Sequence, residues 1–182
     1  MALNWLEELV SQHYQMQGYL VSENIKVKMP KTESRNIQGN SDIDVLAIGE
    51  TEVVHIECQS WYGPSTEQEE KFFKQLITRY ECGKKHIKET YPFLSLENKK
   101  FKRVFVTGGK PGINRTGNGP WDRLENHCKM NRIQLVEIND IIDSHIKLLK
   151  EKFPNKSSHI GKQEGVTRFL MHLIRNGFLK IE

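Results

Sequence analysis

Two apolar segments flank a polar turn at residues 42–59, and both segments carry acidic residues. A hairpin that turns at residues 50–51 sets Asp44 opposite Glu57. Because side chains alternate along a strand, the two acids project from the same face of the hairpin. Facing carboxylates repel each other, so this arrangement is unfavourable for stability alone. A bound divalent cation would reverse that penalty. The segment therefore predicts a β-hairpin whose acidic residues have a functional role.

The same pairing sets Asp42 opposite Gln59, on the acidic face, where His55 also lies. Asp42 stands at the open end of the hairpin, which favours a plain strand-start residue over an extra metal ligand. For His55 we expect a partly buried structural role. The other face carries four residues that suit a protein core: Ile43, Val45, Ile56 and Cys58.

The composition indicates a globular domain without membrane segments. The chain has 182 residues, of which 37% are hydrophobic and 27% charged, enough for one core with a small appendage. No apolar run approaches the roughly 18 to 20 residues of a membrane span. Three scattered cysteines do not suit a disulfide framework or a zinc site, so we expect a reduced, cytoplasmic compartment. A net charge of +4 is compatible with a polyanionic partner such as DNA.

Apolar periodicity predicts helices that alternate with strands along the rest of the chain. Asn4 is a candidate cap for the first helix. This order predicts a mixed-sheet α/β domain over residues 1–150, followed by a helical extension over residues 151–182. The expected helices are residues 2–17, 65–89, 121–130, 141–149 and 163–176, and the expected strands outside the hairpin are residues 19–29, 103–107 and 133–138. The pair Trp61-Tyr62 is expected to interrupt the pattern after the hairpin.

Magnesium and manganese ions prefer oxygen ligands, and two carboxylates with one main-chain carbonyl can hold such an ion. The run Asp44-Val45-Leu46-Ala47, followed by Glu57-Cys58-Gln59, resembles the core motif of the PD-(D/E)xK nuclease superfamily. This superfamily includes restriction endonucleases and archaeal Holliday junction resolvases. The resemblance covers roughly residues 5–80, and the order of elements continues it to residue 149. It implies a restriction endonuclease-like fold, in which three α/β/α layers surround a central mixed sheet.

The resemblance also implies the residues of an active site. Asp44 and Glu57 would ligate Mg²⁺ or Mn²⁺, with the main-chain carbonyl of Cys58 as a third ligand. The implied function is a metal-dependent DNA endonuclease that hydrolyses phosphodiester bonds. Many nucleases that cut both strands are dimers, so a homodimer is compatible with this function, although the sequence carries no signature of one.

An acid on the first helix often completes the site in this superfamily. Glu7 stands eleven residues before Gly18, which is the expected distance, and Glu8 is the fallback. By resemblance, Glu7 would hold a second metal ion or orient a metal-bound water. The plain alternative is an acid that the helix dipole favours in a first turn.

Gln59 departs from the family pattern, which has lysine at this position. Glutamine can hydrogen-bond a water molecule but can neither act as a base nor carry charge. We expect Lys71 or Lys74, on the following helix, to supply the missing charge, while Gln75 resembles a glutamine of some related nucleases. The alternative is a catalytically inactive nuclease-fold module that binds nucleic acid.

Overall fold

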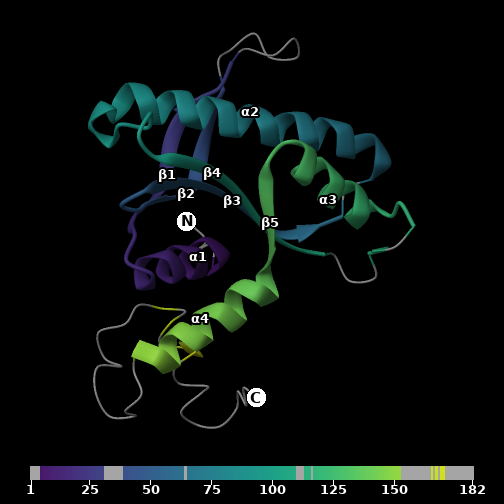
Figure 1. The fold of residues 1–182 in the computed structure, drawn as a ribbon. Helices are drawn as coiled ribbons and strands as arrows, with labels where there is room; N and C mark the ends of the chain where they lie inside the picture. The colour runs from purple at the N-terminus through teal and green to yellow at the C-terminus, as the bar shows by residue number, and fades with distance from the viewer. Residues whose placement is uncertain are drawn as a thin grey trace.

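The structure is a computed structural model that describes residues 5–30, 39–63, 65–109, 113–115, 117–152, 165, 167 and 169–170. Five strands and four α-helices follow one another along this part of the chain (Figure 1). The elements are α1 (Trp5–Met16), β1 (Leu20–Lys28), β2 (Asn40–Ile48), β3 (Glu52–Tyr62), α2 (Thr66–Thr90), the 3-10 turn η1 (Pro92–Leu94), β4 (Lys100–Gly109), α3 (Pro120–Met130), β5 (Ile133–Glu137) and α4 (Ile138–Lys152).

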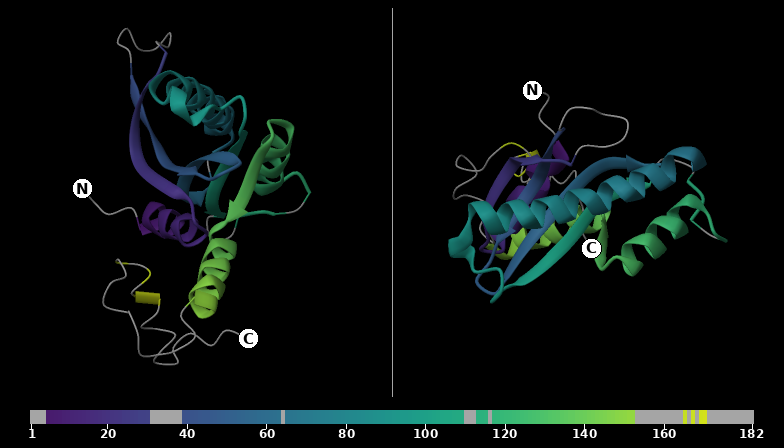
Figure 2. Two further views of the ribbon diagram at one scale, coloured as in Figure 1. Left: turned by 60° about the vertical axis from the view of Figure 1, so that its left-hand side comes forward. Right: turned by 90° about the horizontal axis from the view of Figure 1, so that it is seen from above.

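The five strands form one mixed sheet in the order β1-β2-β3-β4-β5. The first three strands are antiparallel, and β4 and β5 continue parallel to β3. Both parallel connections step in the same direction across the sheet, so right-handed crossovers place α2 and α3 on the same face. Figures 1 and 2 show these two helices on one side of the sheet and α1 and α4 on the other. The fold is the three-layer α/β/α architecture of the restriction endonuclease-like type that the sequence predicts.

The register of the acidic hairpin is confirmed next to the turn, whereas the predicted pairs Asp44–Glu57 and Asp42–Gln59 lie beyond the residues that β2 and β3 pair. Val45 of β2 pairs with Ile56 of β3, and Ile48 pairs with Val53, which is the predicted pairing. The Gly49 amide donates to the Glu52 carbonyl at 2.8 Å and closes the turn. Apolar alternation and turn position were therefore sufficient to set the register here.

The face of Ile43 differs from the prediction. Val45 packs against α1 and α4, whereas Ile43 packs with Ile87 of α2 on the opposite side of the sheet. Asn24 of β1 has a left-handed backbone (φ 53°) and lies between the pairs that β1 forms with Ile43 and Val45. The alternation of side chains along β2 is interrupted at Asp44, the residue opposite Asn24, and Ile43 and Val45 therefore lie on different faces.

The other boundaries differ from the predicted ones by a few residues. β3 continues through Tyr62, so the expected interruption at Trp61-Tyr62 was wrong, although the register with β4 shifts between Gln59 and Tyr62. β4 is longer than predicted, and α4 begins directly after β5. Asn4 lies outside the described residues. No helix within the described ranges is long and apolar enough to cross a membrane.

Part of the predicted C-terminal extension packs on the main domain. Its described residues are helical, and they are Gly165, Thr167, Phe169 and Leu170. The Thr167 amide donates to Gln12 Oε1 of α1 at 3.0 Å, and Leu170 joins the core beside α1 and α4. The rest of the predicted helix at residues 163–176 lies outside the described part.

Candidate functional site

Asp44 lies where β2 leaves β3. The two strands pair as far as Val45 and Ile56, and beyond that point the Cys58 amide donates to Asp44 Oδ2 at 2.7 Å. A side-chain carboxylate thus accepts an amide hydrogen of the neighbouring strand. This bond fixes the Asp44 carboxylate against β3, next to Glu57.

The environment of Asp44 disfavours its charged form. Burial raises the pKa of Asp44, and the nearby carboxylates of Glu57 and Glu7 raise it further. The Cys58 amide and Arg79 act in the opposite direction, and the resulting pKa is about 7. A carboxyl group that titrates near neutrality beside two other acids is in a position where a divalent cation would favour ionisation.

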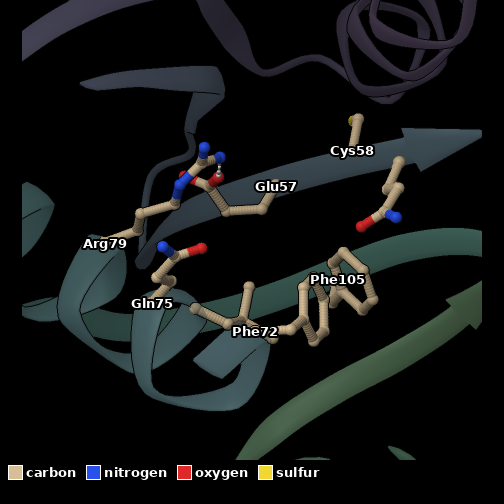
Figure 3. A pocket seen from close by; sticks show the side chains of 8 residues that line it. Glu57, Cys58, Phe72, Gln75, Arg79 and Phe105 are labelled. Carbon is tan, nitrogen blue, oxygen red and sulfur yellow. Dashed lines mark hydrogen bonds and ion pairs between the residues drawn. The ribbon is translucent and has the colours of Figure 1, made fainter. Parts of the chain in front are cut away.

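Glu57 is almost completely buried, and both of its carboxylate oxygens have protein partners. Arg79 Nη1 donates to Oε2 at 2.6 Å, and His55 Nε2 lies 2.8 Å from Oε1. Figure 3 shows the Arg79 side chain extending from α2 to the Glu57 carboxylate. Each carboxylate oxygen has a second lone pair, so these bonds orient Glu57 without exhausting its capacity as a ligand.

His55 is the buried structural residue that the sequence predicts, although its burial is complete. Its ring meets that of Tyr80 edge-on, with 4.7 Å between centroids. Gly83 of α2 makes room for it, because a Cβ atom at this position would lie 2.4 Å from His55 Cε1. The close approach of α2 thus holds the His55 ring in place, and His55 in turn contacts Glu57.

A pocket of about 160 Å³ opens between β3, β4 and α2 beside Glu57. A wider hollow of about 490 Å³ adjoins it, since Gln59, Phe72 and Gln75 line both. The Gln59 amide donates to the Trp61 carbonyl at 2.9 Å and so lies along its own strand. The remaining lining residues of the smaller pocket are Glu57, Cys58, Leu76, Arg79 and Phe105 (Figure 3).

The cation beside Glu57 is Arg79, which the sequence analysis missed. Lys74 pairs instead with Glu70 on the exposed side of α2, at 2.8 Å, and Lys71 lines only the wider hollow. Arg79 follows Gln75 by four residues, so the two share one face of α2. That spacing was a usable signal, because Gln75 itself had been singled out.

The two acids of the first helix have different surroundings in the structure. Glu7 is half-buried and close enough to Asp44 to raise its pKa, whereas Glu8 accepts a hydrogen bond from Gln12 at 2.9 Å. Cys58 points away from the pocket toward α1 (Figure 3), and burial raises the pKa of its thiol well above the ordinary value. Asp42 forms a 2.6 Å ion pair with Lys26, which fits the structural alternative.

The sequence model of the nuclease-related domain, NERD, matches residues 1–108. The chain belongs to the NERD family. Comparison with curated proteins gives no match. A solved crystal structure of a protein of unknown function, AF1548, is similar over 96% of this chain and 79% of its own, with 14% identical residues and a TM-score of 0.44.

The NERD match contains the whole candidate site. Asp44, Glu57, Gln59 and Arg79 all fall within it, whereas α3, β5 and α4 follow it. Within the described residues, no three His, Cys, Asp or Glu side chains gather as a metal-holding group. The set implied by the sequence is smaller, since it has two carboxylates and one main-chain carbonyl.

Proposed function

We propose that this NERD-family chain is a metal-dependent DNA endonuclease that hydrolyses phosphodiester bonds. The observation that carries the proposal is the position of Asp44, which a strand amide fixes beside Glu57 and Glu7 and whose pKa is about 7. Two acids of adjacent strands, with a third from α1 nearby, have no evident benefit for stability. Asp44 and Glu57, with the main-chain carbonyl of Cys58, would supply oxygen ligands of the kind that Mg²⁺ and Mn²⁺ prefer.

The residues present fit such an ion. Asp44, Glu57 and the main-chain carbonyl of Cys58 would hold it, and Glu7 would hold a second ion or orient a water molecule. When bound, the ion polarises a phosphoryl oxygen and lowers the pKa of a bound water. The Cys58 amide orients Asp44, and His55 with Arg79 orients Glu57. Such supporting bonds fix the geometry of ligands before a metal or substrate arrives.

Gln59 would position the attacking water. Its amide carries both donors and an acceptor, and its present partner, the Trp61 carbonyl, occupies one donor. Gln59 lines both hollows, so a water molecule bound in either one would lie near this side chain. The residue thus contributes orientation, while charge and basicity come from elsewhere in the site.

The test is a cleavage assay with plasmid, branched and single-stranded DNA in Mn²⁺ or Mg²⁺, alongside a Mn²⁺ titration. We expect cleavage and metal binding in the wild type, and loss of both in Asp44→Ala. Asp42→Asn is the matched control, because Asp42 lies on the same strand but pairs with Lys26. Intact DNA in every condition, or cleavage that survives both Asp44→Ala and Glu57→Ala, would overturn the proposal.

A second candidate is a catalytically inactive nuclease-fold module that binds nucleic acid. Two observations favour it: Gln59 carries no charge, and both Glu57 oxygens are already bonded to the protein. The same assay separates the two, because an inactive module shifts DNA in a binding gel and leaves it uncut in the presence of Mn²⁺.

A further inference from the structure

The candidate site contains three acids and lacks a cation at the position where the family pattern has lysine. Gln59 is neutral, and Lys74 is engaged by Glu70 on the outer side of α2. Phosphodiester cleavage builds up negative charge on the phosphate, and a fixed cation next to it lowers the barrier. A compensating positive group would therefore have to face the same pocket from another element.

Arg79 is that group. Its Nη1 donates to Glu57 Oε2 at 2.6 Å, and it lines the 160 Å³ pocket together with Gln59 and Gln75. The Glu57 side chain is 2% exposed and the Arg79 side chain 43% exposed, so the guanidinium extends from a buried carboxylate to the accessible surface. One nitrogen of the guanidinium is bonded to Glu57, and part of the side chain is accessible to solvent.

The guanidinium has donors left for a ligand. An arginine side chain carries five N–H donors, and among the described residues the hydrogen bond to Glu57 is the only one that the Arg79 side chain makes. The planar arrangement of the remaining donors matches two oxygens of a phosphate.

Arg123 shows the contrasting case. It forms an ion pair of the same length with Glu69, 2.6 Å, and its side chain is similarly exposed, at 39%. Its Nη1, however, also donates to the Asn118 carbonyl, so two of its nitrogens bind the protein. This pair joins α2 to α3 and lines neither of the two hollows beside Gln59.

We propose that Arg79 contacts the phosphate to be cleaved and supplies the positive charge that lysine supplies in the Glu-x-Lys pattern. This inference rests on the proposed function and specifies which residue of α2 completes the site. Arg79 is then a catalytic residue in its own right, and Glu57 has two roles, as a metal ligand and as the anchor of Arg79.

The experiment tests whether a lysine at position 59 of β3 can replace the positive charge of Arg79. Wild type, Arg79→Gln, Gln59→Lys and the double variant are compared for single-turnover cleavage of a labelled DNA oligonucleotide and for Mn²⁺ affinity. We expect Arg79→Gln to lower the cleavage rate about a hundredfold, because it removes one charge from the transition state. Mn²⁺ affinity should be retained or increase, since a positive charge has left the acidic cluster. The double variant should recover at least about tenfold of the lost rate.

Arg123→Gln is the control for loss of an ion pair, and its cleavage rate should stay within about twofold of the wild type. An unchanged rate in Arg79→Gln, no recovery in the double variant, or joint loss of cleavage and Mn²⁺ binding would overturn the inference. A wild type that binds no Mn²⁺ contradicts the proposed function itself. In a wild type that binds DNA without cutting it, Arg79→Gln must weaken DNA binding more than Arg123→Gln does, and an equal effect would overturn the phosphate contact.

Discussion

Two arginine–glutamate pairs of equal length occur in this NERD-family chain, and they differ in what surrounds them. Arg79–Glu57 and Arg123–Glu69 both measure 2.6 Å, and in both a half-exposed guanidinium meets a buried carboxylate. The second oxygen of Glu69 accepts the Tyr62 hydroxyl, whereas that of Glu57 meets His55, and Glu57 also lies beside Asp44. The two pairs thus have the same length and different neighbours, and the neighbours are the reason why the proposed phosphate contact is assigned to Arg79 and not to Arg123.

The largest expected difference is in catalysis. Glu57→Gln should reduce cleavage on the order of a thousandfold, because it removes a proposed metal ligand and releases Arg79. Glu69→Gln should change the rate less than about threefold, since its effect is confined to the contact between α2 and α3. Both are measured as single-turnover rates with Mn²⁺ below the unfolding temperature of each variant. Equal losses of cleavage rate in the two variants would show that the two pairs contribute equally to catalysis.

Asp44, next to the first pair, should make the metal-free protein less stable as the pH rises. Its pKa is about 7 in the folded protein against an ordinary value of 3.8, so the folded state binds more protons between these values. The contribution of Asp44 to the free energy of unfolding therefore falls from about pH 4 to about pH 7. Asp44→Asn removes this effect and should be about 2 to 4 kcal/mol more stable than the wild type at pH 8.

Denaturant unfolding at pH 4.5 and pH 8, in the presence of a chelator, measures that difference. The advantage of Asp44→Asn should be small at the lower pH and large at the higher one. The asparagine retains an oxygen that can accept the Cys58 amide hydrogen, so loss of that bond does not obscure the result. An advantage that is the same at both pH values would contradict the proposed interaction among the acids.

The second partner of Glu57 can be displaced through Gly83. An alanine Cβ would lie 2.4 Å from His55 Cε1 and 2.6 Å from Nδ1, and His55 is completely buried. Although alanine favours a helix by up to about 1 kcal/mol, the clash should prevail. We expect Gly83→Ala to lower the free energy of unfolding by about 1 to 3 kcal/mol. Thermal unfolding measures it, and a more stable variant would show that His55 moves freely.

The second partner of Glu69 should matter least. Tyr62→Phe removes a 3.0 Å hydrogen bond to Glu69 but leaves the ring against Phe72 and Trp121. The expected cost is about 1 kcal/mol of stability, with cleavage unchanged. Urea unfolding and the oligonucleotide assay measure the two quantities. A marked loss of cleavage would extend the active region as far as the second pair.

The sequence was sufficient for the features that depend on local pattern. Apolar alternation and a short turn fixed the pairing of Val45 with Ile56, and the order of periodic segments predicted the mixed sheet. The opposite face of Ile43 coincides with a left-handed residue, Asn24, on the neighbouring strand, and no periodicity within β2 reveals it.

Side-chain partners across elements were harder to predict. Lysines of α2 were expected near Glu57, but which residue of a long helix faces the sheet depends on how that helix is rotated, and the rotation brings Arg79 inward. The choice between Glu7 and Glu8 likewise followed only from the packing of α1, which directs Glu8 to Gln12. Helical spacing reduces the number of candidate residues but does not identify the one that faces the site.

Because the Cys58 amide donates a hydrogen bond to Asp44, its backbone proton can report on the state of the site. Its resonance should shift when Asp44 gains or loses its own proton and again when an ion enters. Nitrogen-15 labelling would therefore let nuclear magnetic resonance follow the state of the acids directly, with neither DNA nor turnover required.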